Sequence, residues 1–131
     1  MAEITNRRNN TVISGTSDND SIWNEGDSVT INSGAGDDSI YTGGDSVMVD
    51  SDLGDDSIRN DHSNITITGG EGNDRIINTA TLDENGNAIS STDNASISSG
   101  EGDDTVSNDG SNVTIETSLG DDYSRNNGSE F

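Results

Sequence analysis

A branched apolar residue recurs at every ninth position through most of this chain, and this period limits the possible folds more than any other feature. The series breaks once, with a step of 21 residues, which is nine plus 12, and then resumes. Fixed self-similarity at a short period is typical of a stacked coil, in which each turn packs on its neighbours. The series consists of Ile13, Ile22, Ile31, Ile40, Val49, Ile58, Ile67, Ile76, Ile97, Val106 and Ile115.

The complete repeat spans two of these periods and has two unlike halves. One half follows the pattern G-x-G-D-D-S-I, as at 34–40, and the other follows S-N-V-T-I, as at 111–115. The apolar positions are β-branched, turn-forming residues flank them, and no 3.6-residue period is present, so the pattern predicts short strands and no helices. We therefore expect an all-β fold, a right-handed parallel β-roll or β-solenoid with 18-residue coils and two short strands per coil. Ile and Val would fill the space between its two sheets.

The repeat also divides the chain into segments. We expect a lead-in at residues 1–10, the repeat domain at 11–124, and a C-terminal tail at 125–131 that contains residues typical of a cloning linker. The 12 extra residues fall within about 79–90, where they should loop outward without interrupting the stack.

The composition shows that such a coil needs help to fold. Ile, Val, Leu and Phe make up 23 of 131 residues, and the formal net charge is −21. Chains with so little apolar content and so much charge are usually disordered. Cysteine is absent and there is one histidine, so disulfides, thiolate sites and zinc sites are not expected. The 26 acidic residues instead favour a hard cation such as Ca²⁺.

The same composition argues against several partners. A strongly acidic chain is a poor ligand for nucleic acid and for anionic membranes. No apolar run reaches the length of a transmembrane helix or a signal sequence.

One aspartate per repeat falls in the same register, so the coil would line these carboxylates up along one edge. Two carboxylates about 5 Å apart repel by roughly 3 kcal/mol at an effective dielectric constant of about 20. A whole column is tolerable only if cations lie between the coils. The column consists of Asp20, Asp38, Asp56, Asp74, Asp104 and Asp122.

The residues around this column resemble a known repeat. Residues 69–77 (GGEGNDRII) match the RTX, or haemolysin-type, nonapeptide G-G-x-G-x-D-x-U-x at every defined position, and residues 33–41 and 99–107 match it with Ser in first place. The resemblance implies a β-roll that binds Ca²⁺ between successive turns, in large secreted or cell-surface bacterial proteins. The chain would then be a fragment of such a protein. The resemblance implies these metal-site residues: Asp20, Gly34, Gly36, Asp38, Asp52, Gly54, Asp56, Gly70, Gly72, Asp74, Gly100, Gly102, Asp104, Gly120 and Asp122.

Only alternate nonapeptides carry the motif, so we expect calcium along one edge only. Six acidic turns leave five gaps between coils, which predicts about three to five ions. The opposite edge should be held by apolar packing and polar ladders, because its equivalent positions are Val29, Val47, Ile65, Ala95 and Val113.

Two further columns allow alternative interpretations. Asn24, Asn60, Asn78, Asn108 and Asn126, together with Thr42, favour a structural amide ladder over a binding array.

Trp23, Tyr41 and Arg59 share an outward column and form either a structural stack or a patch for a partner. The outward Thr positions of the other strand are interrupted at Met48, which weakens an ice-binding interpretation.

The sequence therefore predicts a calcium-binding structural repeat module that folds on binding Ca²⁺. Enzymatic activity is not expected, since a regular coil with one histidine offers no nucleophile–base pair. The alternative is a glycan-binding or ice-binding surface displayed on the same solenoid. The open coil ends could also permit end-to-end self-association.

Overall fold

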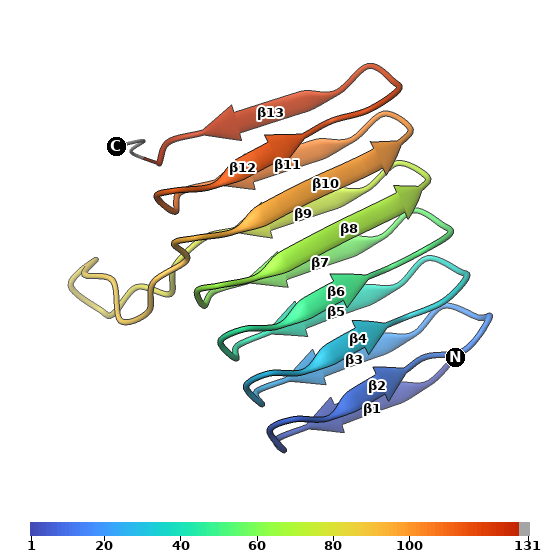
Figure 1. Ribbon diagram of the computed structural model, residues 1–131, viewed down its shortest axis with the longest axis horizontal. Coiled ribbons are helices and arrows are strands. Elements are labelled where there is room, and N and C mark those ends of the chain that lie inside the picture. Colours follow the sequence, from blue (N-terminus) through green and yellow to red (C-terminus); the bar gives the residue numbers. More distant parts are fainter. Residues whose placement is uncertain (129–131) are drawn as a thin grey trace.

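The chain folds into stacked coils that carry two parallel β-sheets, and the described residues contain no helix. The computed structural model describes residues 1–128. In Figure 1 the coils rise from the N-terminus to the C-terminus, and the arrows of the two sheets point in opposite directions. Each coil thus runs along one sheet and returns along the other. The expected all-β parallel solenoid, with two short strands in each coil, is confirmed. None of the described residues forms a helix able to cross a membrane.

The two halves of the repeat form separate sheets. The acidic half supplies the seven-stranded sheet, in the order β1 (Glu3–Asn6), β3 (Ser21–Asn24), β5 (Ser39–Thr42), β7 (Ser57–Asn60), β9 (Arg75–Asn78), β11 (Thr105–Asn108) and β13 (Tyr123–Asn126). The other half supplies the six-stranded sheet, in the order β2 (Val12–Ser14), β4 (Thr30–Asn32), β6 (Met48–Asp50), β8 (Thr66–Glu71), β10 (Ser96–Glu101) and β12 (Thr114–Glu116).

The register follows the sequence repeat. Every strand pairs in parallel with the strand one coil away, and Ile22 lies opposite Ile40, its equivalent in the next repeat. Across the insertion, the sequence separation between paired residues grows by the 12 extra residues, so that Ile76 lies opposite Val106. The stack is therefore continuous across the insertion, as expected. Because parallel pairing repeats without a slip, equivalent residues of successive repeats form straight columns.

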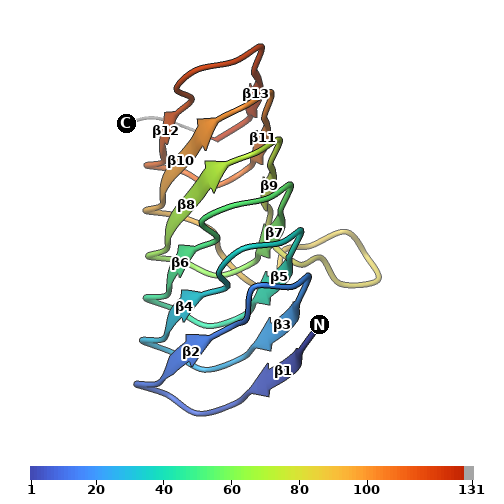
Figure 2. The same cartoon turned by 90° about the vertical axis from the view of Figure 1, so that its right-hand side faces the viewer.

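Ile and Val fill the interior between the sheets. The strands alternate between buried and exposed side chains, as the period of two in a β-strand requires. Ile31, Ile58 and Ile67 have no exposed surface at all. Figure 2, turned by 90°, shows the two sheets as opposite walls of a flattened tube. The core is thus one continuous cluster of apolar side chains that runs along the axis.

The regular stack covers more of the chain than the predicted segments. β1 lies within the expected lead-in and pairs with β3, with Ile4 opposite Ile22. At the other end β13 continues through Asn126, into the expected tail. The last part of that tail, residues 129–131, lies outside the described residues.

The 12 extra residues leave the coil after β9 and project from one edge (Figure 1 and Figure 2). Leu82 and Ala88 form an antiparallel bridge within this loop. Its anchor on the stack is Asp61, which accepts a hydrogen bond from the Thr81 hydroxyl.

A buried amide ladder runs along this edge. The Asn60 amide nitrogen donates to Asn78 Oδ1 at 2.6 Å and to the carbonyl of His62, while its Oδ1 accepts from the His62 N–H. Each amide therefore ties two coils together and also caps its own turn. The structural interpretation of this column is confirmed, and Asn6 extends it at the N-terminal end. Its other links are Asn24–Thr42, Asn78–Asn108 and Asn108–Asn126.

Replacing Asn60 with Ala should destabilise the folded chain by about 2 kcal/mol or more, because several buried polar partners lose their hydrogen bonds. The matched control is Asn32→Ala, at an exposed position of β4, which should change the free energy of unfolding by less than about 0.5 kcal/mol. Denaturant unfolding followed by circular dichroism measures both. Equal effects of the two substitutions would contradict the role of the ladder.

Candidate metal centre

The predicted aspartate column forms along one edge of the stack. Asp38 Oδ1 accepts the main-chain N–H of Asp20 at 2.7 Å, and Asp56 Oδ1 accepts that of Asp38 at the same distance. The pattern continues through Asp74, Asp104 and Asp122. Each carboxylate therefore reaches back to the backbone of the preceding coil. The structure brings all six predicted aspartates into one row.

The second oxygen of most of these carboxylates has no partner. Asp38, Asp56, Asp74 and Asp104 are each 1–2% exposed, and in each the Oδ2 atom makes no hydrogen bond within the described residues. A buried carboxylate oxygen without a partner carries a large desolvation cost. Four such atoms in one column indicate a site built for something that the protein chain itself does not supply.

Main-chain carbonyls enter the same gaps between coils. Gly54 and Gly72 have φ angles of 127° and 133°, a region that favours glycine. A Cβ added at Gly54 would collide with the carbonyl oxygen of Gly36, and one added at Gly72 would collide with that of Gly54. These carbonyls therefore point across the gap at the next coil. The same arrangement recurs at Gly102 and Gly120.

Serine hydroxyls also line the gaps between the coils, and these serines were not among the site residues predicted from the sequence. Ser33, Ser51 and Ser99 are fully buried and occupy the first position of their nonapeptides. The aligned residue Gly69 lies against Asp74 Oδ2, because a Cβ added there would collide with that atom. Ser99 Oγ has no hydrogen-bond partner. These serines could have been found in the sequence, because each replaces the first glycine of the motif, five residues before the aspartate.

The first aspartate of the column differs from the others. Both oxygens of Asp20 accept hydrogen bonds, Oδ1 from the Ala2 N–H and Oδ2 from the Thr16 N–H, and the Thr16 hydroxyl adds to them. The chain itself therefore satisfies both oxygens of this carboxylate. At the far end Asp122 is only half-buried.

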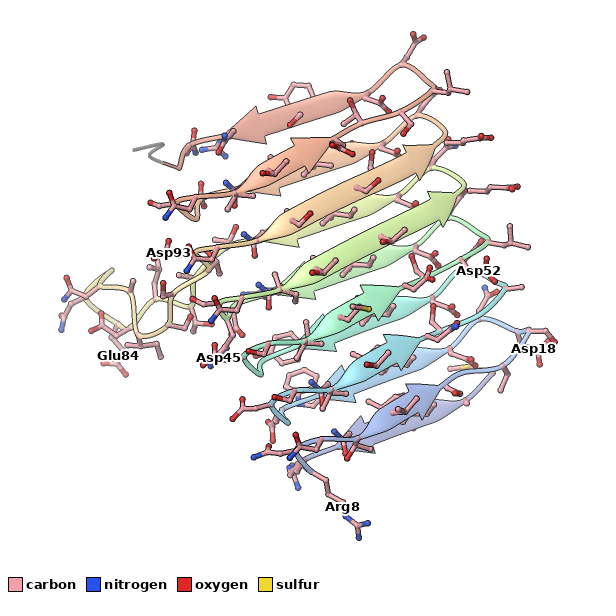
Figure 3. The ribbon with its side chains drawn as sticks, viewed as in Figure 1. Arg8, Asp18, Asp45, Asp52, Glu84 and Asp93 are labelled. Atoms are coloured by element: carbon pink, nitrogen blue, oxygen red, sulfur yellow. The ribbon has the colours of Figure 1, made fainter. Side chains whose placement is uncertain are left out.

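Asp52 takes the place of a motif glycine, with a φ of 71° and an exposed side chain at the turn edge (Figure 3). The main chain at Asp52 thus adopts a positive φ like the motif glycines, while its side chain remains exposed.

Carboxylates alone do not make a metal site in this fold. Within residues 1–128 no three His, Cys, Asp or Glu side chains converge as a set that could hold an ion. Any ion in the gaps must therefore draw most of its ligands from carbonyls and hydroxyls. A mixed set of this kind, with one or two carboxylates, is normal for Ca²⁺.

At the opposite edge, apolar side chains fill the interior of the turns. The position equivalent to the aspartate is filled there by residues that are at most 7% exposed. One carboxylate of these turns, that of Asp61, is buried, and it accepts hydrogen bonds from the hydroxyls of Tyr41 and Thr81. Other acidic residues of this edge, such as Asp45 and Asp93, lie at the outer surface of the turn (Figure 3). The buried residues of this column are Val29, Val47, Ile65, Ala95 and Val113.

Burial changes the acidity of Asp56 and Asp74. Burial raises the pKa of Asp56 to about 7 and outweighs the hydrogen bond from the Asp38 N–H, which lowers this pKa; the neighbouring carboxylates of Asp74 and Asp38 raise it further. Burial likewise raises the pKa of Asp74 to about 6. In the absence of a cation, the carboxyls of Asp56 and Asp74 therefore bind a proton more readily than an ordinary aspartate does.

In the presence of a chelator, the folded state should lose stability as the pH rises from about 4 to about 7. The folded carboxyls hold protons that the unfolded chain has already released near pH 4, so deprotonation costs the folded state more. Thermal unfolding followed by circular dichroism across this range measures the effect. Asp56→Asn should flatten the curve, and an unchanged slope in this variant would contradict the assignment.

The aromatic column forms a stack on the outer face of the seven-stranded sheet. The rings of Trp23 and Tyr41 lie 4.0 Å apart between centroids with an interplanar angle of 29°, and Arg59 follows on the next strand. Trp23 Nε1 donates to Glu25, and the Tyr41 hydroxyl donates to Asp61. The column is thus an ordered ladder that also remains accessible, since Trp23 is 46% exposed.

Comparisons with known proteins return no family model, no curated relative and no solved structure that matches this chain.

Proposed function

We propose that this chain is a calcium-binding structural repeat module whose coil forms when Ca²⁺ enters the acidic turns. The observation that carries the proposal is the row of four buried Oδ2 atoms without partners, on Asp38, Asp56, Asp74 and Asp104. A cation in each gap would satisfy these atoms and offset the repulsion between neighbouring carboxylates.

The donors in the gaps fit Ca²⁺ better than other metals. They are carboxylate, carbonyl and hydroxyl oxygens, and the chain offers no thiol and a single imidazole. Such a set suits a hard cation with many oxygen ligands. The residues that would hold the ions are the four aspartates, with the carbonyls of the glycine column and the hydroxyls of Ser33, Ser51 and Ser99. The orphaned oxygens support about three to five ions, all on one edge.

Binding and folding should be one process in such a module. The net charge of −21 and the thin core disfavour the compact state, while ions that bind only the folded coil stabilise it by mass action. We propose that the module acts outside the cell, in a larger secreted or surface protein of bacterial origin. Millimolar calcium would complete its folding there. Its role is structural and not catalytic.

At neutral pH, calcium added to the chelator-treated chain should convert a largely unfolded circular dichroism spectrum into a β-sheet spectrum. Calorimetry should count about three to five ions. Asp56→Asn should raise the calcium concentration at the midpoint about tenfold, because a charged ligand is lost. The module would not be calcium-dependent if its β-structure were already complete in chelator.

Asp45→Asn is the matched control for this experiment. Asp45 carries the same charge but lies exposed on the opposite edge, where its Oδ1 accepts the Ser63 N–H, a bond that the Asn oxygen can keep. Its midpoint should stay within about twofold of that of the unaltered chain. If the calcium midpoint shifted equally in the two variants, the loss of one negative charge would explain the effect. That result would contradict a specific site at Asp56.

A further inference from the structure

The outer face of the seven-stranded sheet has a composition unlike the rest of the chain. It carries three of the five basic residues but one of the 26 acidic ones, so its formal charge is three minus one, or +2, in a chain of −21. The outer face of the six-stranded sheet has no arginine and no aromatic residue. We call the first surface the arginine face; its outward residues are Glu3, Thr5, Ser21, Trp23, Ser39, Tyr41, Ser57, Arg59, Arg75, Ile77, Thr105, Ser107, Tyr123 and Arg125.

Two arginines at the centre of this face have no anionic partner. Arg59 and Arg75 are exposed, and neither forms an ion pair within residues 1–128, although acidic residues outnumber basic ones about fivefold. They lie on neighbouring strands, since Arg75 is opposite Ser57 and Arg59 follows two residues later on the same face. Diagonal neighbours of this kind are roughly 7–8 Å apart, within reach of long side chains. Two adjacent unpaired cations form a site for an anion.

The aromatic ladder continues this site along the solenoid axis. Tyr41 lies next to Arg59 in the same column, and Trp23 lies next to Tyr41. Hydrogen bonds to Glu25 and Asp61 hold both rings in place, so the apolar surface is ordered before any ligand arrives. Exposed serine hydroxyls on the same strands flank the column.

We propose that the arginine face binds a carboxylated polysaccharide that lies along the axis of the solenoid. Arg59 and Arg75 would hold a sugar carboxylate, for which the guanidinium fork is well suited. The exposed surface of Trp23 would pack against an apolar face of a neighbouring sugar ring. This function goes beyond calcium binding, which only builds the scaffold.

The width of the face favours a single polysaccharide chain over a nucleic acid duplex. Its strands are four residues long, about 13 Å, and the turns at both ends of the strands carry acidic residues. A duplex is wider than this strip and would meet the acidic edges. It also needs many phosphate contacts to bind tightly, and the face offers few cations. A sugar chain with spaced carboxylates stays within the strip.

Titration of calcium-loaded protein with tetragalacturonate tests the proposal. Trp23 is the only tryptophan of the chain, so its fluorescence reports directly on this face. Binding should change that fluorescence and release heat beyond a blank titration into calcium buffer. Arg59→Ser and Trp23→Ala should each raise the Kd about tenfold, with the β-sheet spectrum unchanged. The fully methyl-esterified sugar, which lacks the charge, should bind more weakly by a similar factor.

Arg8→Ser is the matched control, because Arg8 is also exposed and forms no ion pair within the described residues, but it lies at the opposite edge from the acidic turns, off the arginine face (Figure 3). Its Kd should stay within about twofold of the unaltered value. The proposal is overturned if the folded protein does not bind tetragalacturonate, if Arg8→Ser weakens binding as much as Arg59→Ser, or if duplex DNA binds the same face more tightly than the sugar.

Discussion

The whole structure depends on how a carboxylate oxygen is satisfied between two stacked coils. Along one edge the seven-stranded and six-stranded sheets meet at turns whose interior is filled by aspartate. One oxygen of each aspartate holds the preceding coil through a main-chain N–H, and in four of them the other is enclosed without a partner. Since the apolar core is thin, we propose that the state of these oxygens decides whether the coils stay stacked.

The two edges show that the fold does not require aspartate at this position. At the opposite edge the equivalent position holds an apolar residue, mostly Val or Ile, and the turns there are closed by apolar packing and by the Asn ladder. An apolar residue would therefore suit the acidic edge if stability alone mattered. On the proposed function, the buried aspartates make folding depend on calcium, because a cation offsets their mutual repulsion. This asymmetry is the strongest argument for a calcium-controlled module.

Much of this could be predicted from the sequence because a strict repeat fixes the register. Once equivalent positions of successive repeats are known to align, the aspartate column, the apolar columns and the Asn ladder follow. The same rule would have extended the stack to the N-terminus, since Ile4 and Asn6 lie one repeat before Ile22 and Asn24. Self-similarity cannot show which oxygens remain free. Asp20 fits the column like the others, yet Ala2 and Thr16 satisfy it, and only the structure shows this difference.

Calcium-dependent stacking is tested most directly by a crystal structure of the calcium-loaded chain with the metal identified by anomalous scattering. Ions should lie in the gaps on the acidic edge, with the Oδ2 atoms of Asp38, Asp56, Asp74 and Asp104 among their ligands at about 2.3–2.6 Å. Asp20 Oδ2 should keep its bond to Thr16, and the Val-lined edge should hold no ion. Ordered coils whose aspartate oxygens contact only water or protein at neutral pH would contradict a stack held together by calcium.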